Sequence, residues 1–471
     1  MRRPTTIHSD AVGDEPMALG HHIKRTFELA APIIVARTAM IVMFTVDTIM
    51  TGWAGSTELA YIGLGIAPQL VLMLISIGAL QSTVVLTAQA VGAGEAERAG
   101  AILLASQLHA LLLGIMIFIF SFFAEPFFLA TGQLPELAAG AAVVTQQFAW
   151  GSPAVLLFVA TNLFLEATGH PRIGMWIMLG ANVVNVLLNG ILALGWFGFV
   201  EPLGAEGAVI ASSSLRWVAF AVSFGVILIL ARRHGDPFGV LAAFAESKPL
   251  RTSLTGPVGK RIRSIGLPMG LAQGVESAAF ATVVLIAGTL GKTAAAAHQV
   301  TMSLLTLVFM MAIGTAGATA IRVGNAVGRG NRVDTARAGW TGISIGAVLP
   351  IPFAILFISS PNTAARIFTD DPAVLAITSQ TIFVAGFALS ADAAMGVATG
   401  ALRGAGDVWA ALIMQSAAFW CVGIPSAFAL AIYAGYGPPG LFAAIVIGIY
   451  TSLMMLLPRF AYITKGEIRR A

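Results

Sequence analysis

Long apolar runs constrain the fold of this chain more than any other feature of its sequence. They recur along nearly all of its 471 residues, and each contains roughly 20 residues, enough for one α-helix to cross a bilayer. A helix satisfies its own backbone hydrogen bonds, so it is the form that such a run takes in lipid. The predicted spans are 27–53, 60–88, 100–124, 141–165, 172–196, 205–231, 264–290, 297–326, 339–360, 376–402, 409–434 and 438–462.

Composition supports a membrane protein. Hydrophobic residues make up 57% of the chain and charged residues 10%, and the mean hydropathy is +0.87, values that a water-soluble chain of this length could not sustain. The single cysteine, Cys421, lies inside the eleventh predicted span, so no disulfide can form within the chain. We therefore predict an all-α integral membrane protein with twelve transmembrane helices.

A sequence repeat divides these helices into two sets of six. When the chain is shifted by 236 positions, Pro32 falls on Pro268, and the string AVGAG (90–94) falls on AVGRG (326–330) without a gap. An even number of helices in each half gives both halves the same orientation, as in the parallel repeats of some transporters. We expect an N-lobe and a C-lobe around a central cleft that serves as the substrate path.

One long polar stretch between the sixth and seventh spans marks the boundary between the lobes. It mixes charged residues with proline and glycine, which is typical of a linker. The predicted parts are a cytoplasmic N-terminal tail (1–26), the N-lobe with helices 1 to 6 (27–231), a cytoplasmic linker (232–263), the C-lobe with helices 7 to 12 (264–462) and a cytoplasmic C-terminal tail (463–471).

The basic residues predict how the chain is oriented. Of its 26 lysines and arginines, 22 fall on the side of the two termini and the linker, and only Lys292 and Arg366 fall in connections on the opposite side. Because lysine and arginine concentrate in cytoplasmic loops, we expect both termini and the linker in the cytoplasm. We further expect the membrane to be the bacterial inner membrane. This asymmetry explains the pI of about 9.5 without a nucleic-acid partner.

Two acidic residues are predicted at bilayer depth in the C-lobe. Glu276 lies near the middle of the seventh span, and Asp392 lies past the middle of the tenth, which runs the other way. An ionisable residue at this depth is unfavourable and marks a functional site. Two carboxylates close together would repel each other, which favours a bound proton or Na⁺. The alternative is a protonated Glu276 that only hydrogen-bonds a neighbouring helix.

A second polar group is predicted in the N-lobe. Asp47 lies towards the outer end of the first span, and Asn185 and Asn189 lie four residues apart in the fifth, on one helix face. Their amide oxygens suit a cation without adding charge. Pro32, 15 residues before Asp47, removes a backbone hydrogen bond and allows the first helix to bend.

Other polar residues in the spans have ordinary interpretations. Asp47 could pair with an arginine such as Arg37 or Arg216 to stabilise its lobe. His109 is expected to be a hydrogen-bonded packing residue, and His298 a wetted residue at the outer start of its helix.

The chain lacks the reactive motifs of an intramembrane enzyme. Its glycine-rich string VGAGEAERAG has no GK[ST] and follows a predicted membrane helix, which argues against nucleotide binding. We find no metal-ligand cluster in the sequence. We expect a protein that is not an enzyme, with no cofactor and no metal beyond a coupling Na⁺.

Four sequence strings resemble the multidrug and toxic compound extrusion (MATE) family, in its NorM-like branch. They are VDTIMTGWAGSTELA (46–60), AQAVGAG (88–94), NAVGRG (325–330) and GALRGAGD (400–407). The resemblance covers nearly the whole chain from Leu19 onward. It implies an antiporter, coupled to Na⁺ or H⁺, that exports organic, often cationic or aromatic, compounds by alternating access.

The resemblance also implies roles for the polar residues. Glu276 and Asp392 match the carboxylates of the family's C-lobe cation site, and Pro32 matches a proline at which helix 1 bends. Asp47, Asn185 and Asn189 match the polar cluster of the N-lobe. Sodium-driven relatives carry a tyrosine four residues before the helix 10 aspartate, where this chain has Ala388, so the choice between Na⁺ and H⁺ stays open.

Two related functions stay open beside drug export. One is a dedicated metabolite exporter on the same fold, and the other is a flippase for lipid-linked precursors. The acidic character of the buried charges favours export of organic cations over the flippase, whose cleft is typically basic. In each case we expect small organic substrates, contact with membrane lipids and a monomer.

Overall fold

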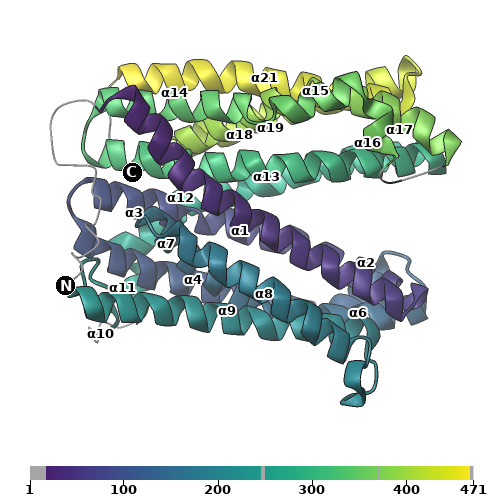
Figure 1. The fold of residues 1–471 in the computed structure, drawn as a ribbon, viewed down its shortest axis with the longest axis horizontal. Coiled ribbons are helices and arrows are strands. Elements are labelled where there is room, and N and C mark those ends of the chain that lie inside the picture. Colours follow the sequence, from purple (N-terminus) through teal and green to yellow (C-terminus); the bar gives the residue numbers. More distant parts are fainter. Residues whose placement is uncertain (1–16, 246–249, 367, 369–370, 467–469, 471) are drawn as a thin grey trace. The chain divides into compact units, whose positions relative to one another are not determined.

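The computed structural model describes residues 17–245, 250–366, 368, 371–466 and 470. Every regular element within these residues is a helix (Figure 1), so the predicted all-α fold class is confirmed.

The described residues of the first half of the chain form thirteen helical segments. They are α1 (Leu19–Ala54), α2 (Ser56–Leu80), α3 (Ser82–Gly92), η1 (Ala96–Arg98), α4 (Ala99–Ser121), α5 (Ala124–Ala130), α6 (Pro135–Ala149), α7 (Ser152–Ala167), α8 (Pro171–Leu192), η2 (Trp196–Gly198), α9 (Gly204–His234), α10 (Val240–Ala245) and α11 (Leu250–Thr255).

The second half has a similar series. Its segments are α12 (Pro257–Thr289), α13 (Lys292–Gly328), α14 (Arg332–Val348), α15 (Ile351–Ser359), α16 (Pro361–Ala365), α17 (Pro372–Gly386), α18 (Leu389–Gly404), α19 (Val408–Ala417), η3 (Ala418–Gly423), α20 (Ile424–Ala427), η4 (Phe428–Tyr433) and α21 (Gly437–Lys465).

The number of membrane-spanning segments agrees with the twelve predicted. Within the described residues, ten helical segments are long and apolar enough to span a bilayer, and two bent pairs raise the total to twelve if each pair is one span. The pair α6 and α7 is bent by 40°, and the pair α17 and α18 by 49°. The two bends lie at nearly equivalent positions of the repeat, because Gly151 and Ala388 are 237 residues apart.

The eleventh span is not a uniform α-helix. It contains two π-helical turns, η3 and η4, on either side of α20. Apolar periodicity does not distinguish the two hydrogen-bond patterns over one turn, so the sequence could not predict them. Such turns inside α-helices are frequent at functional sites.

The helices pack into two compact units. Unit 1 comprises the described residues of Met1–Ile34, Gly92–Gly94 and Leu271–Ala471, and unit 2 those of Val35–Val91 and Glu95–Gly270.

The units divide within α1 and α12. The first part of α1, up to Ile34, packs in unit 1, and the first part of α12, up to Gly270, packs in unit 2. Pro32 and Pro268 lie inside these helices, two residues before the points of division. Each proline removes one backbone hydrogen bond from its helix. These units are defined by packing, whereas the lobes and the linker were predicted from the positions of the membrane spans. The predicted lobe and linker boundaries therefore stay a prediction.

Part of the predicted linker, residues 232–263, is helical and packs in unit 2. Asp236 caps α10, because its Oδ1 accepts a hydrogen bond from the N–H of Val240 at 2.7 Å. The N–H of Gly100 in α4 donates to the carbonyl of Phe238 at 2.7 Å. A side chain at Gly100 would collide with the linker backbone, with Cβ only 2.1 Å from a carbonyl oxygen. Four linker residues, 246–249, lie outside the described part of the chain.

Small residues bring α13 and α18 close together in unit 1. A Cβ at Gly400 would lie 2.6 Å from the carbonyl oxygen of Ala316, and one at Gly404 would lie 2.4 Å from that of Ala320. Such small residues permit close backbone approach between membrane helices. The contact also shows that the two helices run parallel, and it holds α18, which carries Asp392, against α13.

Candidate functional site

In unit 2, three neutral side chains surround the carboxylate of Asp47. The side-chain amides of Asn185 and Asn189 donate to Oδ1 of Asp47 at 3.0 and 2.7 Å. The hydroxyl of Ser212 donates to Oδ2. Asp47 is 5% exposed, and its three partners are buried as well. The structure thus brings together all three N-lobe residues singled out in the sequence.

The local geometry of three helices builds this cluster. Asn185 and Asn189 lie one turn apart on α8, as predicted, and their nitrogens rather than their oxygens face the carboxylate. Ser212 comes from α9 and also accepts a hydrogen bond from Asn185 at 3.2 Å. Sequence reasoning missed Ser212, because serines are common in membrane helices and nothing in its spacing marks it. The cluster is a set of donors around an anion rather than a ready cage for a cation.

The two arginines proposed as partners of Asp47 have other contacts. Nη2 of Arg37 lies 3.1 Å from Oε1 of Glu166, which also accepts a hydrogen bond from Asn162 at 2.8 Å. The guanidinium of Arg216 lies over the ring of Phe148, 4.2 Å from its centroid. Among the described residues, no ion pair joins Asp47 to either arginine, but the charge of Arg216 does act on Asp47.

Unit 1 holds the two C-lobe carboxylates. Glu276 lies in α12, and Asp392 lies in the first turn of α18, just after the bend from α17. Both are partly buried, and they lie close enough for their charges to interact. Arg403, further along α18, interacts electrostatically with Glu276. No described residue donates a hydrogen bond to either carboxylate. This acid pair fits a cation or a proton better than the Asp47 cluster does.

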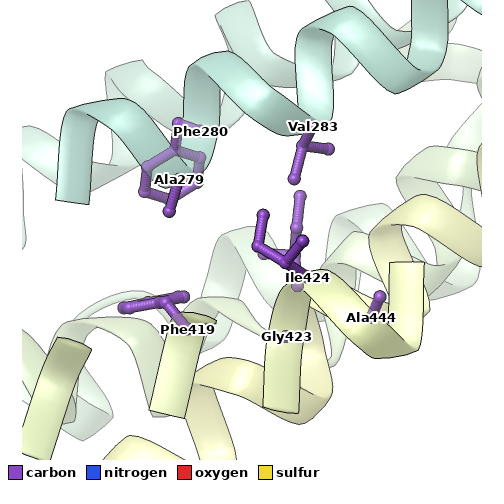
Figure 2. A pocket seen from close by; sticks show the side chains of 8 residues that line it. Ala279, Phe280, Val283, Phe419, Gly423, Ile424 and Ala444 are labelled. Carbon is purple, nitrogen blue, oxygen red and sulfur yellow. The ribbon is translucent and has the colours of Figure 1, made fainter. Parts of the chain in front are cut away.

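Figure 2 shows a small apolar hollow in unit 1. Its lining residues on α12 begin one helical turn after Glu276 in sequence. The rings of Phe280 and Phe419, from α12 and η3, face it with centroids 6.0 Å apart. Its full lining is Ala279, Phe280, Val283, Phe419, Gly423, Ile424, Ala444 and Ile445. The π-helical turn η3 therefore forms part of the wall of this hollow.

For His109 and His298, the sequence predicted ordinary roles rather than ligand binding, and their surroundings in the structure test these predictions. Nδ1 of His109 lies 2.7 Å from the carbonyl oxygen of Ala105, so the prediction of a hydrogen-bonded packing residue is confirmed. The prediction of a wetted His298 is wrong, because this side chain is 2% exposed and its ring lies 5.1 Å from that of Phe442. Phe442 of α21 packs against the imidazole, a contact between helices that sequence alone does not reveal.

These features define a multi-pass membrane protein with buried carboxylates in its spans, and comparison with known proteins gives its family. The family model MatE matches residues 32–191 and again residues 268–429. The two matches begin at Pro32 and Pro268, the prolines that the internal repeat relates. The chain belongs to the MatE family, whose members are transporters and not enzymes.

Relatives and solved structures extend this similarity to nearly the whole chain. The chain is 30% identical to the probable multidrug resistance protein NorM of Xanthomonas campestris pv. campestris, over 93% of each chain. It is 30% identical to the multidrug resistance protein MdtK of Pectobacterium atrosepticum, over 94% of this chain and 96% of that one. A crystal structure of MATE in the bent conformation has a TM-score of 0.84 at 19% identity, covering 96% of this chain and 98% of that one.

Proposed function

We propose that this protein is a cation-coupled antiporter that exports organic, often cationic or aromatic, compounds by alternating access. Its relatives NorM and MdtK are named multidrug resistance proteins and share 30% identity with it. The observation that carries the proposal is the pair Glu276 and Asp392, two interacting carboxylates within membrane-spanning helices, to which no described residue donates a hydrogen bond.

The acid pair explains how export is coupled to an ion. Two neighbouring carboxylates without donors are stabilised by any positive charge that binds between them. A Na⁺ ion or proton from one side and a cationic substrate from the other would compete for the same charge. Binding of one then displaces the other, which is the requirement for exchange rather than co-transport. The aromatic hollow beyond Glu276 offers apolar surface beside that charge.

The Asp47 cluster has a different part in this proposal. A change in charge at Asp47 alters the hydrogen bonds that join α1 to α8 and α9. Pro32 lies in the same helix and permits a bend, so the cluster can select between straight and bent forms of α1. The driving ion shifts that equilibrium only by its differential affinity for the two forms.

We place the protein in the bacterial inner membrane, as a monomer with both termini in the cytoplasm. Lys260 is exposed and belongs to the predicted cytoplasmic linker, and Lys292 begins α13 on the predicted outer side. With Cys421 replaced by serine, a cysteine at Lys292 should react with an impermeant reagent added to intact cells. A cysteine at Lys260 should react only after the membrane is opened. The reverse pattern would overturn the orientation.

Transport in reconstituted vesicles tests the function itself. Purified protein should move a fluorescent organic cation against its gradient when an inward Na⁺ or H⁺ gradient is imposed, and should stop when that gradient is dissipated. Separate Na⁺ and H⁺ gradients identify the ion. No movement of organic cations under either gradient would favour the metabolite exporter or the flippase of lipid-linked precursors.

A further inference from the structure

The first turns of α1 are held in unit 1 by buried charged groups that the proposed transport sites do not use. His22 of α1 is 0% exposed, Arg322 of α13 is 5% exposed, and Asp334 of α14 is 1% exposed. Arg322 counts in the sequence among the basic residues of the cytoplasmic side, but it lies inside its helix rather than in a loop. Charged groups are rarely buried to this extent unless they are paired with one another.

Arg322 is the centre of the contact. Its Nη2 lies 2.7 Å from Nδ1 of His22. Its Nη1 donates to Oγ1 of Thr26 at 2.8 Å and to the carbonyl oxygen of His22. Nε2 of His22 lies 3.4 Å from Oδ1 of Asp334. One arginine thus contacts two successive turns of α1, and the imidazole lies between that arginine and an aspartate.

Asp334 is itself held in place by several neighbours. Its Oδ1 accepts a hydrogen bond from the backbone N–H of Met17 at 3.0 Å, and its Oδ2 lies 3.5 Å from Nη2 of Arg329. The backbone N–H of Asp334 donates to Asn331 at 2.9 Å, which caps α14. Arg337 donates to the carbonyl of Met17 at 2.7 Å. The chain just before α1 is therefore attached to α14 as well.

These contacts determine the protonation state of His22. An arginine only donates hydrogen bonds, so the Nδ1 that faces Arg322 must accept, and the ring proton then lies on Nε2, towards Asp334. A second proton on Nδ1 would remove that acceptor and place two cations in contact. Among the described residues, the charged or titratable groups that act on His22 are Arg322 from α13, Asp334 from α14 and His21 of its own helix. Asp334 attracts a protonated ring, but it already neutralises Arg329.

We propose that His22, Arg322 and Asp334 form a proton-sensitive latch that holds the first part of α1 in unit 1 and releases it when His22 takes up a second proton. The latch lies ten residues before Pro32. Its release frees the segment on one side of that proline, while the ion pair of Arg37 with Glu166 still holds the other side in unit 2. The use of the latch in transport rests on the proposed function, whereas the latch itself does not.

Distances between spin labels test the latch without any transport measurement. Ile23 directly follows His22 and is 41% exposed, and Val333 directly precedes Asp334 and is 46% exposed. Ile23→Cys and Val333→Cys can therefore carry the spin labels. The single native cysteine, Cys421, is replaced by serine. In detergent or nanodiscs at pH 8 we expect one narrow, short distance. At pH 5 we expect more than half of the population at longer, broader distances.

Three variants separate the latch from general acid effects. Asparagine at position 22 offers Arg322 an oxygen acceptor that cannot titrate, so His22→Asn should keep the short distance at pH 5. Arg322→Gln should show the long distances at both pH values. Arg25→Gln, which removes a partly exposed ion pair with Glu28 on the same helix, should behave like the parent.

Each result bears on the proposal. A parent distribution that does not change between pH 8 and pH 5, or a His22→Asn protein that changes as the parent does, would overturn the proton switch. A short distance in Arg322→Gln, in protein that elutes as a folded monomer, would overturn the latch. If Arg322→Gln does not fold, the parent pH series and His22→Asn still decide the question. Loss of organic-cation transport in all proteins, with the distances as expected, would count only against the proposed function.

Discussion

The carboxylates of the two units lie in opposite chemical environments. Asp47 in unit 2 accepts hydrogen bonds from three neutral side chains. Glu276 and Asp392 in unit 1 accept none from the described residues, and their charges act on each other. Donors stabilise a buried carboxylate as an anion, whereas like charges without donors need a proton or a cation. The contrast supports placing ion binding at the unit 1 pair and a conformational role at Asp47.

The repeat shows how this difference could arise. Glu166 and Arg403 lie 237 positions apart, in equivalent turns of the two halves. In unit 2, Glu166 pairs with Arg37. The position of unit 1 that corresponds to Arg37, 236 residues further on, is the uncharged Gln273. In unit 1, Arg403 occupies the position that corresponds to Glu166, and it interacts with Glu276. One copy of the scaffold thus neutralises its buried acid internally, and the other leaves acidic charge for a ligand.

The largest effect is expected from neutralising the unit 1 pair. Glu276→Gln and Asp392→Asn should each reduce gradient-driven efflux to the level of empty vesicles, because the isosteric amides keep the packing but remove the charge for which ion and substrate compete. The exposed Glu136→Gln serves as the control and should transport normally. Normal efflux in both variants would move the ion site away from unit 1.

A large loss of stability is expected in unit 2. Arg37→Gln should lower the free energy of unfolding by about 3 kcal/mol, because it leaves the buried Glu166 without its partner. Thermal unfolding in detergent measures this loss. The double variant Arg37→Gln with Glu166→Gln should recover most of it. If the single variant is as stable as the parent, the internal ion pair does not distinguish the two halves.

Asp47→Asn should have a smaller effect on stability and a clear one on coupling. The amide that replaces the carboxylate presents an N–H group to the neighbouring N–H and O–H donors, so the free energy of unfolding should fall by about 1–3 kcal/mol. We expect the protein to be expressed as a monomer and its transport to stop or to lose its dependence on the driving ion. Fully coupled transport in vesicles would place coupling at Glu276 and Asp392 alone. Recovery of stability on neutralising Arg216, whose charge acts on Asp47 without a direct ion pair, would instead give Asp47 a structural role.

The smallest effect is expected at Arg403. Arg403→Gln removes a positive charge that opposes cation binding at Glu276. The concentration of coupling ion that gives half-maximal transport should fall by roughly threefold to tenfold, which corresponds to about 1 kcal/mol. A titration of transport rate against ion concentration measures it. A rise instead of a fall would show that Arg403 positions Glu276 for the ion rather than competing with it.

The sequence by itself determined the features that depend on local physical chemistry and on duplication. Apolar runs predicted the spans because a helix in lipid needs only a length and a hydropathy. The 236-residue register predicted the two related halves, and the family matches begin at the same two prolines. The rarity of acids in membrane spans was sufficient to single out Asp47, Glu276 and Asp392. These inferences needed no knowledge of which helices are neighbours.

Only the tertiary structure decided which side chains meet. Ser212 joins Asp47 because α9 packs beside α1 and α8, and Arg37 pairs with Glu166 rather than with Asp47 because α7 faces it. His298 is buried because α21 covers it. Contacts between helices depend on how far each is rotated and shifted against its neighbours, and in lipid many such arrangements bury apolar surface equally well. The pattern of hydrophobic residues therefore carries little information about them, and the packing of the whole unit selects one.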